Sequence, residues 1–190
     1  QAALVAGFPD ARYQRAELRI LKARHLAQVQ LLLDTGPRYF FGPISIEQDI
    51  LDPDFVQQFV HIEQGAPFNT DALLELQLAL SDSGYFSRVE VTPRRAAASD
   101  FHVPVVITTK PAKPRRYAFG LGYGTDTGPR LSLATEFRRI NKRGHRVFAD
   151  IRLSEILQSV GAQYKIPIGN LVSDRLIFSS RADFETFADG

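Results

Sequence analysis

The sequence contains no cysteine. This absence excludes disulfides, thiolate catalysis and cysteine-ligated metal sites. No run of about 18 apolar residues occurs, so a transmembrane helix is not expected. The net charge is only +2, which argues against a protein whose whole surface binds nucleic acid. The chain begins with Gln1 in the middle of a pattern, without a methionine or a signal segment, so we expect a fragment of a longer protein.

The polar residues do not form a pattern typical of a catalytic or metal site. Four histidines are scattered without the spacing of metal ligands: His25, His61, His102 and His145. Asp82 and Asp100 have no paired acid or base near them in the sequence. The glycine run at 120–124 lacks the third glycine of a dinucleotide-binding loop, because Thr125 stands there. We therefore predict no enzymatic activity, no cofactor and no metal site.

From Tyr117 onward, residues alternate with a period of two. A strand places successive side chains on opposite faces, so alternation divides the residues into two sets. One set carries no charge: Tyr117, Phe119, Leu121 and Tyr123, then Leu131, Leu133, Thr135 and Phe137, then Val147, Ala149, Ile151 and Leu153, and last Val160, Ala162, Tyr164, Ile166 and Ile168. The other set holds the charges, among them Arg130, Glu136, Asp150 and Arg152. We expect four antiparallel strands with one uncharged face.

Strands of about 9–11 residues with one apolar and one polar face are typical of an outer-membrane barrel. A soluble β-sandwich also alternates and has one solvated face, so the period alone leaves both folds open. The lack of charge on one face over four strands favours the barrel. A fifth strand is expected around Leu176–Phe184, where the alternation is poor and the register stays open.

An internal repeat lies upstream of these strands. The same offset of 77 residues separates Gly7 from Gly84, each followed by an aromatic residue, and Pro37 from Pro114, each at the start of a similar short motif. Two landmarks that share one offset indicate a tandem module of that length.

The complete copy has a readable order of elements. A strand is expected at Tyr39–Glu47, bent at Gly42-Pro43. Asp52 and Pro53 are typical of a helix start, and a second helix is expected from Asn69 or Thr70 to Gly84. Two further strands, joined by the 93–100 loop, follow at Ser87–Thr92 and His102–Thr109. The order is β-α-α-β-β. The first copy holds only its tail, a helix end at Ala2–Ala6 and strands near Ala16–Ile20 and Val29–Leu33.

A β-α-α-β-β repeat that leads into barrel strands resembles the polypeptide-transport-associated (POTRA) modules of the bacterial outer-membrane assembly and secretion superfamily, which carry a bacterial surface antigen barrel. The segment Tyr123–Arg130, with Asp126, Gly128, Pro129 and Arg130, resembles the first barrel hairpin of the translocation and assembly module branch. Gly144-His145 and Tyr164–Pro167 resemble that branch too. The resemblance implies an α+β fold of POTRA modules followed by the first antiparallel strands of a transmembrane β-barrel.

The resemblance also implies domain boundaries. Residues 1–36 are the C-terminal part of a POTRA module, the second one, and 37–113 are a complete third module. Residues 114–190 are the first five or so strands of a truncated barrel.

The same resemblance implies location and function. It places the barrel in the bacterial outer membrane and the POTRA modules in the periplasm, and it implies insertion or secretion of β-barrel and autotransporter proteins. The implied partners are the lipid bilayer, client outer-membrane proteins and an inner-membrane-anchored protein that spans the periplasm, but no nucleic acid. Three alternatives stay open: a two-partner secretion transporter, the membrane anchor of a secreted lipase-like enzyme, and a soluble β-rich binding module.

Two groups of candidate site residues follow. The resemblance implies a barrel seam at which client strands add to the first strand, and glycines weaken a strand interior, so the predicted client-strand edge is Tyr117, Phe119, Gly120, Leu121, Gly122, Tyr123 and Gly124. The predicted contacts with lipid phosphates are Lys113, Arg115, Arg116, Lys142 and Arg143. The alternative for the basic residues at 110–116 is a solvated linker made stiff by Pro111 and Pro114.

Overall fold

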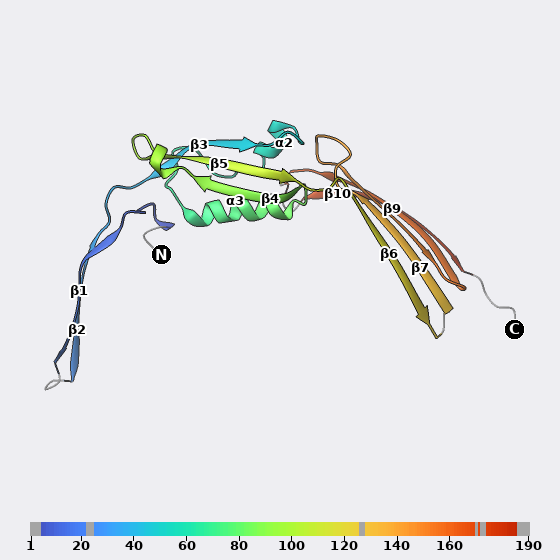
Figure 1. Ribbon diagram of the computed structural model, residues 1–190, viewed down its shortest axis with the longest axis horizontal. Coiled ribbons are helices and arrows are strands. Elements are labelled where there is room, and N and C mark those ends of the chain that lie inside the picture. Colours follow the sequence, from blue (N-terminus) through green and yellow to red (C-terminus); the bar gives the residue numbers. More distant parts are fainter. Residues whose placement is uncertain (1–4, 22–24, 126–127, 170, 172–173, 186–190) are drawn as a thin grey trace. The chain divides into compact units, whose positions relative to one another are not determined.

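We describe a computed structural model of the chain, covering residues 5–21, 25–125, 128–169, 171 and 174–185 (Figure 1). The chain divides into two compact units. The first comprises Gln1–Glu47, His61–Gln77 and Glu90–Thr108, and the second Gln48–Val60, Leu78–Val89 and Thr109–Gly190. Among the described residues, no helix has the length and apolar character needed to cross a membrane.

The N-terminal segment forms a hairpin of two antiparallel strands, β1 (Arg12–Leu21) and β2 (Leu26–Asp34). Both are longer than the sequence pattern predicts. Of the expected helix end at Ala2–Ala6, residues 2–4 lie outside the described residues. Gly7, which follows it, adopts a φ of 90°, as a residue after a helix end often does.

Three strands form a mixed sheet in the order β3-β5-β4. They are β3 (Phe40–Glu47), β4 (Phe86–Pro93) and β5 (His102–Pro111). Strand β3 runs parallel to β5, and its register shifts between Phe41 and Ile44, at the predicted Gly42-Pro43 bend. A Cβ atom at Gly42 would lie 3.0 Å from the backbone of Val103 and Pro104, so the close approach of the two strands favours glycine.

The helices lie between β3 and β4 in the sequence: α2 (Pro53–Gln57) and α3 (Thr70–Asp82). A short 3₁₀ turn, η2 (Arg95–Ala97), follows β4. Asn69 Oδ1 accepts a hydrogen bond from the Asp71 backbone N–H at 2.8 Å, which satisfies one free donor at the start of α3. Asp52 occupies the N-cap position of α2 as predicted, but its carboxylate makes no capping hydrogen bond. Gly84, with φ of 72°, follows α3.

The buried core belongs to this β-α-α-β-β segment. Alternate residues of β5 are fully buried, and α3 buries residues three and four positions apart, the spacing of one helix face. The buried apolar side chains are Phe41, Leu51, Phe55, Val56, Phe59, Phe68, Leu73, Leu76, Leu80, Tyr85, Phe86, Val89, Val103, Val105 and Ile107.

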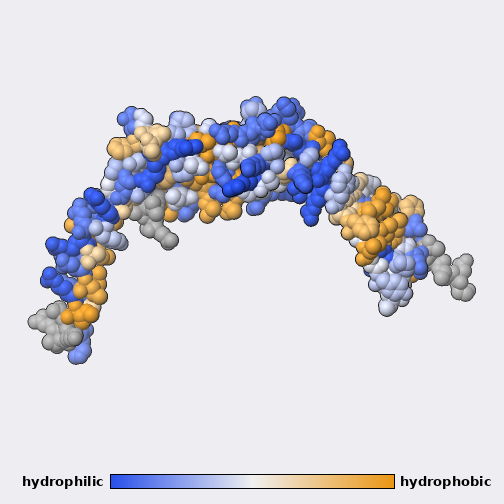
Figure 2. All heavy atoms as spheres, in the orientation of Figure 1, coloured by the Kyte–Doolittle hydropathy of each residue, from blue (hydrophilic) through white to orange (hydrophobic). Residues whose placement is uncertain are grey.

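The C-terminal part forms an antiparallel sheet of five strands in the order β10-β9-β8-β7-β6. The strands are β6 (Arg115–Gly124), β7 (Gly128–Phe137), β8 (Arg146–Leu153), β9 (Leu157–Pro167) and β10 (Arg175–Glu185). One row across the sheet pairs Phe119, Leu133, Ile151, Val160 and Ala182. This row fixes the register of the fifth strand, whose uncharged residues Leu176, Phe178, Ser180, Ala182 and Phe184 continue the uncharged face. In Figure 2, hydrophobic residues (orange) gather on the part of this sheet that the view shows.

The opposite face carries the charges. Asp150 is only 6% exposed and forms ion pairs with Arg152 at 3.3 Å and with Arg181 at 3.7 Å. Arg181 reaches it across β9, where a Cβ atom at Gly161 would lie 2.7 Å from Asp150 Oδ1. The separation of faces has one exception at a strand end: Arg115 pairs with Phe137 and so shares the uncharged face.

Candidate functional site

Strand β6 lies at one edge of the five-stranded sheet, as β10 does at the other. Within the described residues it pairs with β7 alone, so the backbone of its outer side has no strand partner there. Its four large side chains on the uncharged face are 66–78% exposed: Tyr117, Phe119, Leu121 and Tyr123. An edge of this kind can add a further strand through backbone hydrogen bonds.

The glycines of β6 differ in their surroundings. A Cβ atom at Gly120 would lie 2.5 Å from Ser132 Oγ, a hydroxyl that can rotate away, and 3.9 Å from Ser132 Cβ. A Cβ atom at Gly122 would meet nothing within 4 Å. Lack of space therefore does not account for Gly122, where the weak strand propensity is the remaining physical effect of glycine.

The predicted first hairpin joins β6 to β7. Gly124 pairs with Gly128, Tyr123 with Pro129 and Gly122 with Arg130. Gly128 has a φ of 64°, which glycine adopts without strain. Asp126, the remaining residue predicted here, lies outside the described residues.

The predicted basic residues lie at one end of the sheet. The Arg138 backbone N–H donates to the Pro114 carbonyl at 2.9 Å, which ties the segment before β6 to the β7–β8 turn. Lys113, Arg115 and Arg116 therefore lie at the same end of the sheet as Lys142 and Arg143. The Arg115 guanidinium lies 5.4 Å from the centre of the Phe137 ring.

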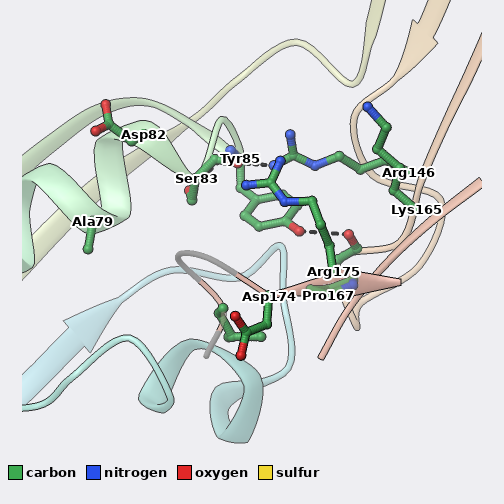
Figure 3. Close-up of a pocket in the computed structure, with 11 residues that line it drawn as sticks. Ala79, Asp82, Ser83, Tyr85, Arg146, Lys165, Pro167, Asp174 and Arg175 are labelled. Carbon is green, nitrogen blue, oxygen red and sulfur yellow. Dashed lines mark hydrogen bonds between the residues drawn. The ribbon is translucent and has the colours of Figure 1, made fainter. Parts of the chain in front are cut away.

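The sequence did not predict a set of contacts around Tyr85, inside the second compact unit, which we call the Tyr85 joint (Figure 3). It connects Ser83 and Tyr85 with Gly144 and Arg146. The Tyr85 hydroxyl donates to the Gly144 carbonyl at 2.6 Å, and the Arg146 guanidinium lies 4.5 Å from the centre of the Tyr85 ring. The same guanidinium donates to the Ser83 carbonyl. Gly144 has a φ of 73°, and a Cβ atom there would lie 2.5 Å from the Tyr85 hydroxyl and 2.6 Å from the Phe55 ring. The Gly84-Tyr85 repeat was the only sequence signal for this joint, and it did not name a partner.

Burial raises the pKa of Tyr85, and the positive charges of Arg146 and Arg175 partly oppose that effect. At physiological pH the hydroxyl is neutral, as an ordinary phenol is, and donates to Gly144. Beside it lies a cavity of about 220 Å³ whose lining includes Ser83, Tyr85, Arg146, Lys165 and Arg175. The described residues contain no group of histidine and carboxylate side chains that could hold a metal ion. Within the described residues, the arrangement provides a strand edge on β6 and a buried hydrogen bond at Tyr85.

A protein-family comparison identifies the β-α-α-β-β segment. Residues 39–111 match the POTRA family, described as a surface antigen variable number repeat. Residues 39–111 form a POTRA domain. The POTRA domain supplies β3, α2, α3, β4 and β5, and with them the buried core and Tyr85.

Solved structures resemble the chain beyond the POTRA domain. BamA from Haemophilus ducreyi, in a structure that lacks POTRA domains 1–3, matches with a TM-score of 0.75 at 18% identity, over 95% of this chain and 34% of that one. CdiB from Acinetobacter baumannii matches with a TM-score of 0.57 at 13% identity, over 94% of this chain and 33% of that one. The chain thus spans about a third of the length of these two solved chains. The predicted fold class is confirmed: a POTRA domain followed by antiparallel strands that match a barrel region.

Proposed function

We propose that this chain is part of an outer-membrane protein that inserts or secretes other proteins, with its POTRA domain in the periplasm. The POTRA domain followed by barrel strands supports this function, because that combination is the architecture of the outer-membrane assembly and secretion superfamily. The protein acts without enzymatic chemistry, by offering binding surfaces to an unfolded client.

The observation that carries the mechanism is the edge position of β6. A client strand adds to the outer side of β6, where its backbone groups pair with those of Tyr117–Gly124. Gly122 keeps this edge weak enough to exchange partners, because it has open space around it and yet carries no side chain to pack.

Within the superfamily, we assign the chain to the outer-membrane component of the translocation and assembly module, on the resemblance of the Tyr123–Arg130 hairpin. Its partner is then an inner-membrane-anchored protein that spans the periplasm. A two-partner secretion transporter is the alternative that the fold also accommodates. The full-length sequence separates the two, since the first carries three POTRA modules and the second two.

Cysteine cross-linking tests the edge directly, because this chain has no cysteine of its own. Leu121→Cys places a thiol on β6, and Leu131→Cys places one on the paired position of β7. The Leu131 position is a matched control, because β7 is paired on both sides. In the full-length protein with cysteine-bearing client segments, we expect disulfide-linked complexes through residue 121 and none through residue 131. Equal cross-linking at both positions, or none at 121 while clients are assembled, would overturn the proposal.

A further inference from the structure

A groove lies between the start of α2 and the β7–β8 turn, wholly inside the second compact unit. It has a volume of about 530 Å³. Its lining combines two carboxylates, Asp52 and Asp54, with one guanidinium, Arg143. His145 and Ile166 line the side formed by the sheet.

Backbone hydrogen bonds hold the two sides of this groove together. The Asp52 backbone N–H donates to the Lys142 carbonyl at 3.0 Å, and Arg139 Nη1 donates to the Ile50 carbonyl at 3.2 Å. On the sheet side, His145 Nδ1 lies 2.7 Å from the Tyr164 hydroxyl. The groove is therefore a built feature of the fold, with walls fixed by contacts that do not involve its three charged side chains.

Part of the groove's lining belongs to the uncharged side of the sheet, because Ile166 pairs with Leu176 in that set. Tyr164, which His145 contacts, is also on that side, because it pairs with Val147. If the uncharged face lies against hydrocarbon, as the proposed function requires, the strand ends on that face lie at the level of the lipid headgroups. An aromatic residue such as Tyr164 is typical of that level. The molecules that reach the groove from this side are phospholipids.

The groove carries both negative and positive side chains, and so it matches a zwitterionic lipid headgroup. Asp52 makes no capping hydrogen bond with α2, so its carboxylate is not used by the helix. Arg143 suits a phosphate, since a guanidinium binds phosphate oxygens with two parallel hydrogen bonds. Carboxylates suit an ammonium group with N–H donors. A primary ammonium has three such donors, and a quaternary choline group has none.

We propose that this groove binds the headgroup of a phosphatidylethanolamine molecule, with the phosphate on Arg143 and the ammonium on Asp52 and Asp54. The inference rests on the proposed placement of the sheet in the outer membrane and adds a specific lipid site to it. The bound lipid joins helix α2 of the POTRA domain to the β7–β8 turn of the sheet at the membrane surface.

Native mass spectrometry of the full-length protein in detergent tests the site. The probes are phosphatidylethanolamine, phosphatidylcholine and phosphatidylglycerol with identical acyl chains. We expect phosphatidylethanolamine to bind about tenfold more tightly than phosphatidylcholine, the factor that one charge-assisted hydrogen bond is worth. The double variant Asp52→Asn with Asp54→Asn should abolish this preference, and Arg143→Gln should weaken both lipids. Arg138→Gln is the matched control, because Arg138 carries the same guanidinium near the same turn, pairs with Glu136 and does not line the groove.

Equal binding of the two zwitterionic lipids by the parent protein would overturn the proposal. So would tightest binding of phosphatidylglycerol that Arg143→Gln and Arg138→Gln weaken equally, because that result indicates unspecific attraction to anionic lipid. Failure of the proposed function is distinguishable from both results. A protein that stays folded and monodisperse without detergent contradicts the membrane placement, and a failed cross-link at residue 121 contradicts the client edge without affecting lipid binding.

Discussion

Strands β5 and β6 follow each other in the sequence and alternate in the same way, yet they place their apolar side chains in opposite surroundings. On β5, Val103, Val105 and Ile107 are fully buried. On β6, Phe119 and Leu121 are 66% and 75% exposed. The difference arises from what covers each sheet: helix α3 turns its buried leucines toward the core of the POTRA domain, and no helix follows β6 in the described sequence. Alternation thus tells which residues share a face, and the neighbouring elements tell what that face meets.

The largest effect should come from the core of the POTRA domain. Leu76 is 3% exposed, so Leu76→Ala should lower the free energy of unfolding by about 2–5 kcal/mol through lost burial and a cavity. Leu78→Ala is the control on the same helix, because Leu78 is 51% exposed. Urea unfolding followed by circular dichroism measures both. Equal losses would mean that the two faces of α3 do not differ as described.

The second test places a charge on the uncharged face of the following sheet. Leu133→Arg should destabilise the inserted protein by about 2–4 kcal/mol if residue 133 lies near the middle of the bilayer. Ser179→Arg is the control, because Ser179 pairs with Gln163 on the charged face. Unfolding from lipid vesicles, followed by heat-modifiable gel mobility, measures the difference. Insertion of both variants at the parental stability would show that this face does not meet lipid.

The two faces of the strands and the order of the elements were predictable because each depends on local periodicity and turn residues. The bend at Gly42-Pro43 and the five strands belong to this class. The register of β10 was not predictable, because Ser180 and Ala182 on its uncharged face and Ile177 on the other blur the alternation, and only pairing with β9 resolves it. The hydrogen bond between Tyr85 and Gly144 was also not predictable, because it joins residues 59 positions apart in the sequence.

The contrast between buried and exposed positions also applies to polar groups, and Tyr85 is the buried example. The Tyr85→Phe substitution removes the hydrogen bond at 2.6 Å and leaves the Gly144 carbonyl without this donor in a buried place. We expect a loss of about 1–3 kcal/mol. Tyr39→Phe is the control, because the Tyr39 hydroxyl donates at 2.8 Å to Asp10 in an exposed position. Thermal unfolding of the three proteins measures both effects, and an equal or larger loss at Tyr39 would contradict the role of burial.

The smallest expected effect is a difference between the pKa values of Tyr39 and Tyr85 in their response to salt. The pKa of both is raised from the ordinary value of 10.0, at Tyr39 mainly because its hydroxyl donates to Asp10 and at Tyr85 mainly because of burial. A raised folded-state pKa favours the neutral phenol, so its stabilising contribution is complete below about pH 10 and is lost as the pH rises through the folded-state value. Ultraviolet titration of the parent minus each phenylalanine variant isolates the two groups. Added salt should shift the pKa of Tyr39 more than that of Tyr85, because salt screens the exposed charges of Asp10 and Arg95 and does not reverse burial. If salt shifts both pKa values equally, the Tyr85 hydroxyl is open to water and is not the buried donor that the geometry indicates.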